Sequence, residues 1–247
     1  ADTDNVGEDA GDTTITAVDG NDGGVDATTP VVSVDASTAN VGTQLAGSNG
    51  GLFTINADGT ASFDPNGEFE SLAVGADDTT SVDVTVQDTA GNTDTASYTV
   101  TVNGANDAPS GADSSQNVRI NRTVEIEAAD FGFTDPDTGD TLDSVEIDAI
   151  PAVGALFVDG SAGGTDDGTQ DGETALGNGD TVAAADIAAG NLLYVTPTTA
   201  GTTVTIDFIV NDGTDPAAAS NTLTLNATSP PSGGGGGGGT PGGGSTI

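Results

Sequence analysis

The chain has 247 residues, of which 39 are acidic and only two, Arg119 and Arg122, are basic, so its net charge is −37. A surface of that charge repels phosphate backbones and anionic lipid, which argues against nucleic acid and against membrane insertion. The sequence has no cysteine, histidine or lysine, so disulfides, thiolate zinc sites and the usual catalytic triads cannot be built.

The first 30 residues are rich in Asp, Gly and Thr, which favours turns over regular structure. Only residues 15–18 have the composition of a strand. Residues 1–30 are therefore predicted to form an acidic lead-in that contributes one strand, either at a sheet edge or exchanged with a neighbour.

Alternating apolar and polar residues begin at residue 31 and predict strands with one buried face. The clearest example is residues 81–86, where valine alternates with polar residues, and its partner is residues 97–102. Turn-forming residues 88–94 between them predict a hairpin. Further strands are predicted at residues 31–34, 52–55 and 60–63.

The second half repeats this pattern, since Val210 lies 124 residues after Val86 and ends an equivalent strand. The repeated hairpin comprises residues 204–210 and 222–225. One helix is predicted over residues 180–190, which have an alanine-rich body and a glycine stop. The remaining predicted strands are residues 123–126, 144–147, 155–158 and 191–195.

The fold class that follows is all-β, with two tandem β-sandwiches of the immunoglobulin or cadherin type. The predicted domains are the lead-in at 1–30, a sandwich at 31–108, a second sandwich at 109–229 and a flexible glycine-rich tail at 230–247. Alternation predicts a set of buried side chains, namely Val84, Val86, Val100, Val102, Ile206, Phe208, Val210, Leu223 and Leu225.

Two stretches of the chain resemble known repeat families. Residues 84–94 and 98–109, which end in Asn106-Asp107-Ala108-Pro109, resemble the closing part of VCBS-type repeats, and residues 57–65 and 69–75 extend that likeness. Motifs in the second half are similar to bacterial cadherin-like repeats, at residues 129–140, 150–156, 186–192 and 208–213. Both families occur in large secreted surface adhesins. The resemblance implies a sandwich fold, calcium at domain junctions, an extracellular or cell-surface location and a role in adhesion.

Several acidic loops are candidate calcium sites, because calcium prefers six to eight oxygen ligands in flexible geometry. The best is residues 135–140, where aspartates alternate around a turn, with loops 106–107 and 211–212 as its companions. Solvated turn carboxylates are the alternative for each loop, and the weaker candidates are loops 166–173, 88–94 and 19–22. The predicted calcium ligands are Asn106, Asp107, Asp135, Asp137, Asp140 and Asp212.

The sequence therefore predicts a non-enzymatic, calcium-stabilised structural or adhesive surface protein that acts as a unit of a larger cell-surface assembly. Its expected partners are other copies of itself or neighbouring surface proteins, and a host or substrate surface. The alternative is a self-assembling subunit of an extracellular filament, sheath or virion surface from a halophilic or marine source. In that case the acidity serves solvation in salt, which screens repulsion between carboxylates.

Overall fold

A computed structural model describes residues 2–18, 30–160 and 173–230. The acidic loops at 19–22 and 166–172 and the glycine-rich tail from residue 231 lie outside these residues. The chain forms two compact units, and each is described by itself. The first unit comprises residues 1–111, 133–145 and 209–220, and the second comprises residues 112–132, 146–208 and 221–247.

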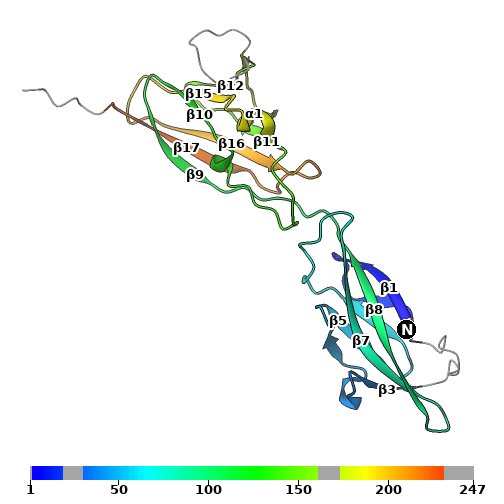
Figure 1. Cartoon of the computed structure of the whole chain (residues 1–247). Helices are drawn as coiled ribbons and strands as arrows, with labels where there is room; N and C mark the ends of the chain where they lie inside the picture. Colours follow the sequence, from blue (N-terminus) through cyan, green and yellow to red (C-terminus); the bar gives the residue numbers. More distant parts are fainter. Residues whose placement is uncertain (1, 19–29, 161–172, 231–247) are drawn as a thin grey trace, which may run out of the picture. The chain divides into compact units, whose positions relative to one another are not determined.

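The first sandwich has two four-stranded sheets (Figure 1). Side chains from both sheets meet in a core centred on Phe53, Phe63 and Tyr98, which are at most 1% exposed. A short 3-10 turn, η1 (Thr38–Asn40), follows β3. One sheet has the order β1 (Asp2–Gly7), β8 (Thr93–Asn103), β7 (Asp77–Gln87), β3 (Val31–Val34), and the other β2 (Thr13–Ile15), β6 (Ala61–Asp64), β5 (Leu52–Ile55), β4 (Gln44–Ala46).

The second sandwich pairs a five-stranded sheet with a four-stranded one (Figure 1). Phe131, at the end of the turn η2 (Ala128–Phe131), packs edge-on against Phe208 with ring centroids 4.9 Å apart. The five-stranded sheet has the order β14 (Asp180–Ala183), β11 (Ser144–Ala149), β16 (Thr203–Asn211), β17 (Asn221–Thr228), β9 (Ser114–Arg119). The other has the order β10 (Thr123–Glu125), β15 (Leu192–Val195), β12 (Ala155–Val158), β13 (Thr174–Ala175).

The strands predicted from alternation are present, and the all-β fold class is confirmed. Eight of the nine side chains predicted to be buried are buried, and Val86, near the end of β7, is only partly buried. The helix predicted over 180–190 is wrong in its first half. Val182 alternates with exposed neighbours and enters the sheet as part of β14, so only α1 (Ala184–Ala188) is helical.

Besides β14, the strands β1, β4, β9 and β13 were not predicted. β1 runs parallel to β8, and of its six residues only Val6 is buried, so the sequence shows no alternation. Its carboxylate at Asp4 accepts a hydrogen bond from the backbone N–H of Thr16 (2.6 Å), and the Tyr98 hydroxyl donates to the Thr16 carbonyl (2.7 Å). Backbone pairing and these polar contacts therefore hold β1 in place more than apolar burial does.

Replacing Phe53 with alanine should destabilise the first sandwich by about 3–5 kcal/mol, because the ring is fully buried and lies 4.8 Å from that of Phe63. Urea unfolding followed by tyrosine fluorescence and circular dichroism would measure the loss, since Tyr98 and Tyr194 place one reporter in each sandwich. Val74→Ala is the control, because Val74 is 69% exposed and should change stability by less than about 0.5 kcal/mol. Equal effects of the two changes would contradict this description of the core.

Candidate metal centre

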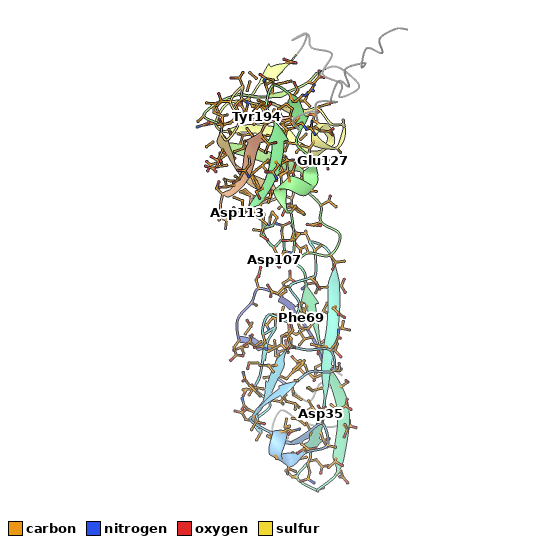
Figure 2. All side chains as sticks on the ribbon, turned by 90° about the vertical axis from the view of Figure 1, so that its left-hand side faces the viewer. Asp35, Phe69, Asp107, Asp113, Glu127 and Tyr194 are labelled. Carbon is orange, nitrogen blue, oxygen red and sulfur yellow. The ribbon has the colours of Figure 1, made fainter. Side chains whose placement is uncertain are left out.

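Five segments that are distant in sequence bring carboxylates together in the first compact unit. They are the residues after β1, the loop between β6 and β7, the segment after β8, the loop before β11 and the turn between β16 and β17. The loop between β6 and β7 is fixed by Phe69, a buried side chain of the first core (Figure 2), and Glu70 is the next residue along the chain. Strand ends and an apolar anchor therefore determine where these acidic groups lie.

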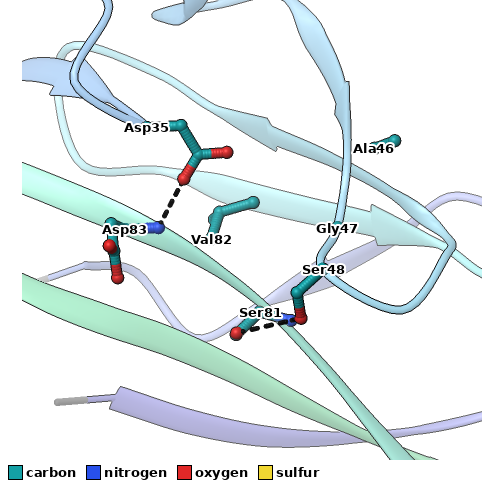
Figure 3. Close-up of a pocket in the computed structure, with 7 residues that line it drawn as sticks. All are labelled: Asp35, Ala46, Gly47, Ser48, Ser81, Val82 and Asp83. Atoms are coloured by element: carbon teal, nitrogen blue, oxygen red, sulfur yellow. Dashed lines mark hydrogen bonds between the residues drawn. The ribbon is translucent and has the colours of Figure 1, made fainter.

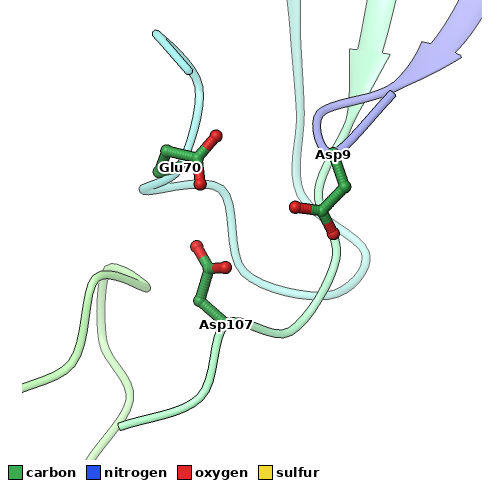
Figure 4. Close-up of side chains that lie close together, drawn as sticks. All are labelled: Asp9, Glu70 and Asp107. Atoms are coloured by element: carbon green, nitrogen blue, oxygen red, sulfur yellow. The ribbon is translucent and has the colours of Figure 1, made fainter. Parts of the chain in front are cut away.

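Asp9, Glu70 and Asp107 form the first cluster (Figure 4). One carboxylate oxygen from each lies within 4.8 Å of the others. Calcium binds oxygen at about 2.3–2.6 Å, so two ligands on opposite sides of one ion are about 5 Å apart. A single ion can therefore contact all three carboxylates.

Asp135, Asp140 and Asp212 form the second cluster, with the same limit of 4.8 Å between their oxygens. The local fold is set by a turn in which the Asp137 N–H donates to Asp135 Oδ1 (2.9 Å). Asp212 begins the turn after β16, where its Oδ1 accepts the N–H groups of Thr214 (2.6 Å) and Asp215 (2.8 Å).

The segment after β8 connects the two clusters. Asn106 Nδ2 donates to Asp212 Oδ2 (3.1 Å) and lies 3.2 Å from Asp215 Oδ2. The next residue, Asp107, donates its backbone N–H to Asp137 Oδ2 (2.9 Å). The six predicted ligands thus lie in one continuous acidic site.

Several oxygens in this site are buried and have no hydrogen-bond donor. In the described part of the chain, five buried side-chain polar atoms lack a partner, and four of them are carboxylate oxygens of Glu8, Asp107, Asp135 and Asp137. Glu8 and Asp137 are only 2% and 3% exposed. Buried carboxylate oxygens without donors are costly unless a cation coordinates them, so the arrangement fits a metal ion.

The pKa values follow from this crowding. Burial raises the pKa of Glu8 above its ordinary 4.5, and the charges of Asp107 and Asp137 add to the increase. Burial also raises the pKa of Asp107, with Glu70 as the main charged neighbour. The pKa of Asp135 is raised by burial and by Asp212, although the hydrogen bond from Asp137 opposes the shift.

Asp212 behaves differently, since its pKa is lowered. Burial alone would raise the pKa, but hydrogen bonds from the backbone of Asp215 and Thr214 and from the side chain of Asn106 outweigh it. Asp212 is therefore held as a carboxylate whether or not an ion is present.

The donor set suits calcium better than other common metals. It consists of carboxylate oxygens, with an amide oxygen available from Asn106, and the chain has no cysteine or histidine to favour zinc or copper. Three or more carboxylates around one position match a flexible, high-coordination ion better than the compact octahedron of magnesium.

Sequence reasoning missed Glu8, Asp9 and Glu70. Glu70 lies in a stretch that resembles the VCBS-type repeat, so the resemblance contained a signal for it. Glu8 and Asp9 follow β1, and without that strand nothing in the sequence places them near residue 107.

Other acidic positions have structural explanations. Asp35 Oδ1 accepts the backbone N–H of Asp83 (2.8 Å) beside a pocket that also contains Ser48 and Ser81 (Figure 3). Asp88 accepts the N–H groups of Ala90 and Asn92 within its own turn, at 2.8 Å each. These carboxylates satisfy backbone donors and belong to neither of the two clusters.

No family model matches the sequence, and no curated protein matches it. Solved structures match it at the level of the fold. The crystal structure of Drosophila N-cadherin EC1-4 aligns with a TM-score of 0.50 and 13% identity over 91% of this chain and 48% of that one. The crystal structure of human protocadherin-24 EC1-2 aligns with a TM-score of 0.50 and 12% identity over 93% and 95%.

The fold is cadherin-like. This chain spans about half of the N-cadherin structure, and the low identity shows a shared fold alone. Among the residues described, no helix has the length and apolar character needed to cross a membrane. The likeness to a VCBS-type repeat stays a prediction from the sequence.

In the presence of a chelator, the stability of the first compact unit should increase as the pH falls from 7 toward 5. Carboxyl groups with a raised pKa take up protons when the chain folds. Their contribution to the free energy of unfolding is therefore most favourable at low pH and is lost as the pH rises through their folded-state pKa values. Glu8→Gln should stabilise the chelated protein at pH 7 and flatten this dependence. Thermal melts across the pH range test both, and stability that falls steadily from pH 7 to 5 would contradict the raised pKa values.

Proposed function

We propose that this chain is a non-enzymatic module of an extracellular adhesive surface protein, stabilised by calcium, and that it acts as one unit of a larger cell-surface assembly. The observation that supports this best is the set of four buried carboxylate oxygens without donors, gathered from loops that are far apart in sequence. The cadherin-like fold and the resemblance to bacterial adhesin repeats agree with it.

The proposed ligands are Asn106, Asp107, Asp135, Asp137, Asp140 and Asp212, joined by Glu8, Asp9 and Glu70. When bound, calcium neutralises carboxylates that otherwise repel one another. The residues of the chain then hold the segment after β8 against the loop before β11 and the turn after β16. The proposed domain boundaries remain 31–108 and 109–229.

A structural function is also consistent with the side chains available. The chain has no histidine, cysteine or lysine to act as a nucleophile or as a base near neutral pH. A chain of this composition acts through its surface, and the proposed partners are other copies of itself, neighbouring surface proteins or a host or substrate surface.

Millimolar calcium should raise the melting temperature more than sodium chloride of the same ionic strength does. Specific binding at about 100 times the dissociation constant adds about 2.7 kcal/mol to the free energy of unfolding, whereas sodium only screens charge. Differential scanning calorimetry with both salts measures the difference. Equal increases would instead favour a halophilic protein whose acidity serves solvation.

Asp137→Asn should reduce the calcium-dependent increase in melting temperature and the affinity seen by titration calorimetry. It removes one charge from a side chain that is 3% exposed and has an oxygen without a donor. Asp83→Asn is the matched control, because it makes the same chemical change at an exposed carboxylate outside the clusters. Identical calcium responses of the two variants would show that the acidic site is not where calcium binds.

A further inference from the structure

The two sandwiches share one topology, so equivalent positions can be identified from the hydrogen bonds. β1 pairs in parallel with β8, and just beyond it the Glu8 N–H donates to the Asn103 carbonyl (3.0 Å). β9 pairs in parallel with β17, and just beyond it the Ile120 N–H donates to the Thr228 carbonyl (3.2 Å). Ile120 therefore occupies the position in the second sandwich that Glu8 occupies in the first.

At the end of the second sandwich that contains Ile120, the positions equivalent to other acidic residues of the first sandwich also lack carboxylates. β15 pairs with β10 as β6 pairs with β2, so loop 196–202 corresponds to the loop 65–76 that carries Glu70. Loop 196–202 contains no aspartate or glutamate. After β17 the described chain continues with Ser229 and Pro230, which are uncharged and follow Thr228 as residues 104 and 105 follow Asn103.

The only two cationic side chains of the sequence lie at this same end. The hydroxyl of Thr196, a buried side chain, lies 2.8 Å from the carbonyl oxygens of both Arg119 and Arg122 and accepts the Arg122 N–H (2.9 Å). One side chain thus fixes the turn that presents both arginines. Both are exposed, and within the described residues neither forms an ion pair with a carboxylate.

A pocket of about 350 Å³ lies beside this turn, lined by Val153, Gly154 and residues of loop 196–202. Val153 is 43% exposed, one of three large apolar side chains in the described part that are so open to solvent. We call Arg119, Arg122, Val153, Gly154 and loop 196–202 the arginine pole. Exposed arginine beside apolar and hydroxyl groups is typical of protein interfaces, where arginine is enriched.

The β7–β8 hairpin of the first sandwich has the complementary charge. Its turn at Asp88 uses Oδ1 to accept backbone N–H groups as the equivalent turn at Asp212 does. The second oxygen differs, because Asp212 Oδ2 accepts Asn106 from the segment after β8, whereas Asp88 Oδ2 accepts Asn92 of its own turn (2.7 Å). Asp94, on β8 close to this turn, is exposed.

We propose that the arginine pole binds the β7–β8 hairpin of a second copy of this chain, with Arg119 and Arg122 facing Asp88 and Asp94. Within one chain, the segment after β8 contacts the Asp212 turn. The proposed contact is its equivalent between two copies, with the guanidinium groups of the arginine pole in place of the carboxylates at the corresponding end of the first sandwich. Because the two surfaces differ, the contact is heterologous and joins copies head to tail, in a ring or in an open row. It needs no ion at the candidate metal centre.

A second copy fits this surface better than an acidic polysaccharide. Arginine binds carboxylates through paired hydrogen bonds, and a hairpin presents two of them at fixed positions. A long polyanion would also meet the acidic surface of a chain of charge −37. Aromatic side chains, on which sugar rings usually stack, are absent from the arginine pole.

Sedimentation velocity of the full chain tests the proposal by comparing two variants of equal charge, with millimolar calcium and again with a chelator. Arg119→Gln/Arg122→Gln removes the pole, and Ala128→Glu/Ala129→Glu adds two charges at exposed positions elsewhere, so both change the net charge from −37 to −39. Loss of two exposed ion pairs should weaken association about 2- to 30-fold in the first variant alone. If the wild-type chain still associates in the chelator, the contact does not depend on calcium binding.

A charge exchange identifies the partner surface. Arg119→Glu/Arg122→Glu and Thr89→Lys/Asp94→Lys should each fail to associate alone, whereas an equal mixture should associate because each supplies the surface that the other lacks. A monomeric wild-type chain, unchanged association of the arginine variants, or a mixture that stays monomeric would overturn the proposal. Binding of the wild type to an acidic polysaccharide with no rescue in the mixture would assign the pole to that ligand instead.

Discussion

Repulsion between carboxylates that the fold itself brings together is the constraint on which the first compact unit depends. Glu8, Asp107, Asp135 and Asp137 each have a buried oxygen without a donor, and the pKa values of three of them are raised by burial and by their neighbours. The chain has no lysine, and its two arginines lie in the second sandwich. The compensating charge must therefore come from solution, which connects the stability of this unit to the ions around it.

The sandwiches tolerate the repulsion between these carboxylates because their apolar cores form from other side chains. Phe53, Phe63 and Tyr98 in the first, and Phe131 and Phe208 in the second, are buried against side chains of alternating strands. The acidic loops are attached to the ends of these strands. Phe69 shows the connection most clearly, since its buried ring anchors the loop that carries Glu70.

The sequence was most informative where one face of a strand is buried. Strands β7, β8, β16 and β17 alternate cleanly and were predicted because period-two burial leaves a direct pattern in the chain. The limits of β16 were predicted to within one residue, whereas β7 and β8 begin four residues earlier than predicted and β17 ends three residues later. β1 leaves no such pattern, since backbone pairing and Asp4 hold it, and Glu8 and Asp9 were missed with it. Residues 180–190 were predicted as helix although their first part is a strand. Alanine favours helix in this stretch, whereas burial of Val182 favours a strand.

The candidate site was predictable in part for the same reason. Asp135 and Asp137 lie two residues apart in one turn, so local sequence reveals them. Contacts such as that between Asn106 and Asp212 join residues more than 100 positions apart, and only the resemblance to known repeats suggested them. Long-range convergence of this kind has no local signature, and it appears only once the strands are placed.

The parallel pairing of β1 with β8 has a consequence for mechanical load. The beginning of β1 and the end of β8 lie at opposite ends of the paired segment, because Asp2 is opposite Tyr98 and Gly7 is opposite Asn103. Tension applied between the start of β1 and the segment after β8 therefore pulls the two strands along their length in opposite directions. All the hydrogen bonds between them are loaded together in shear, instead of opening one after another as in a hairpin pulled from its open end. The same geometry joins β9 to β17, so each sandwich resists stretching through its first and last strands.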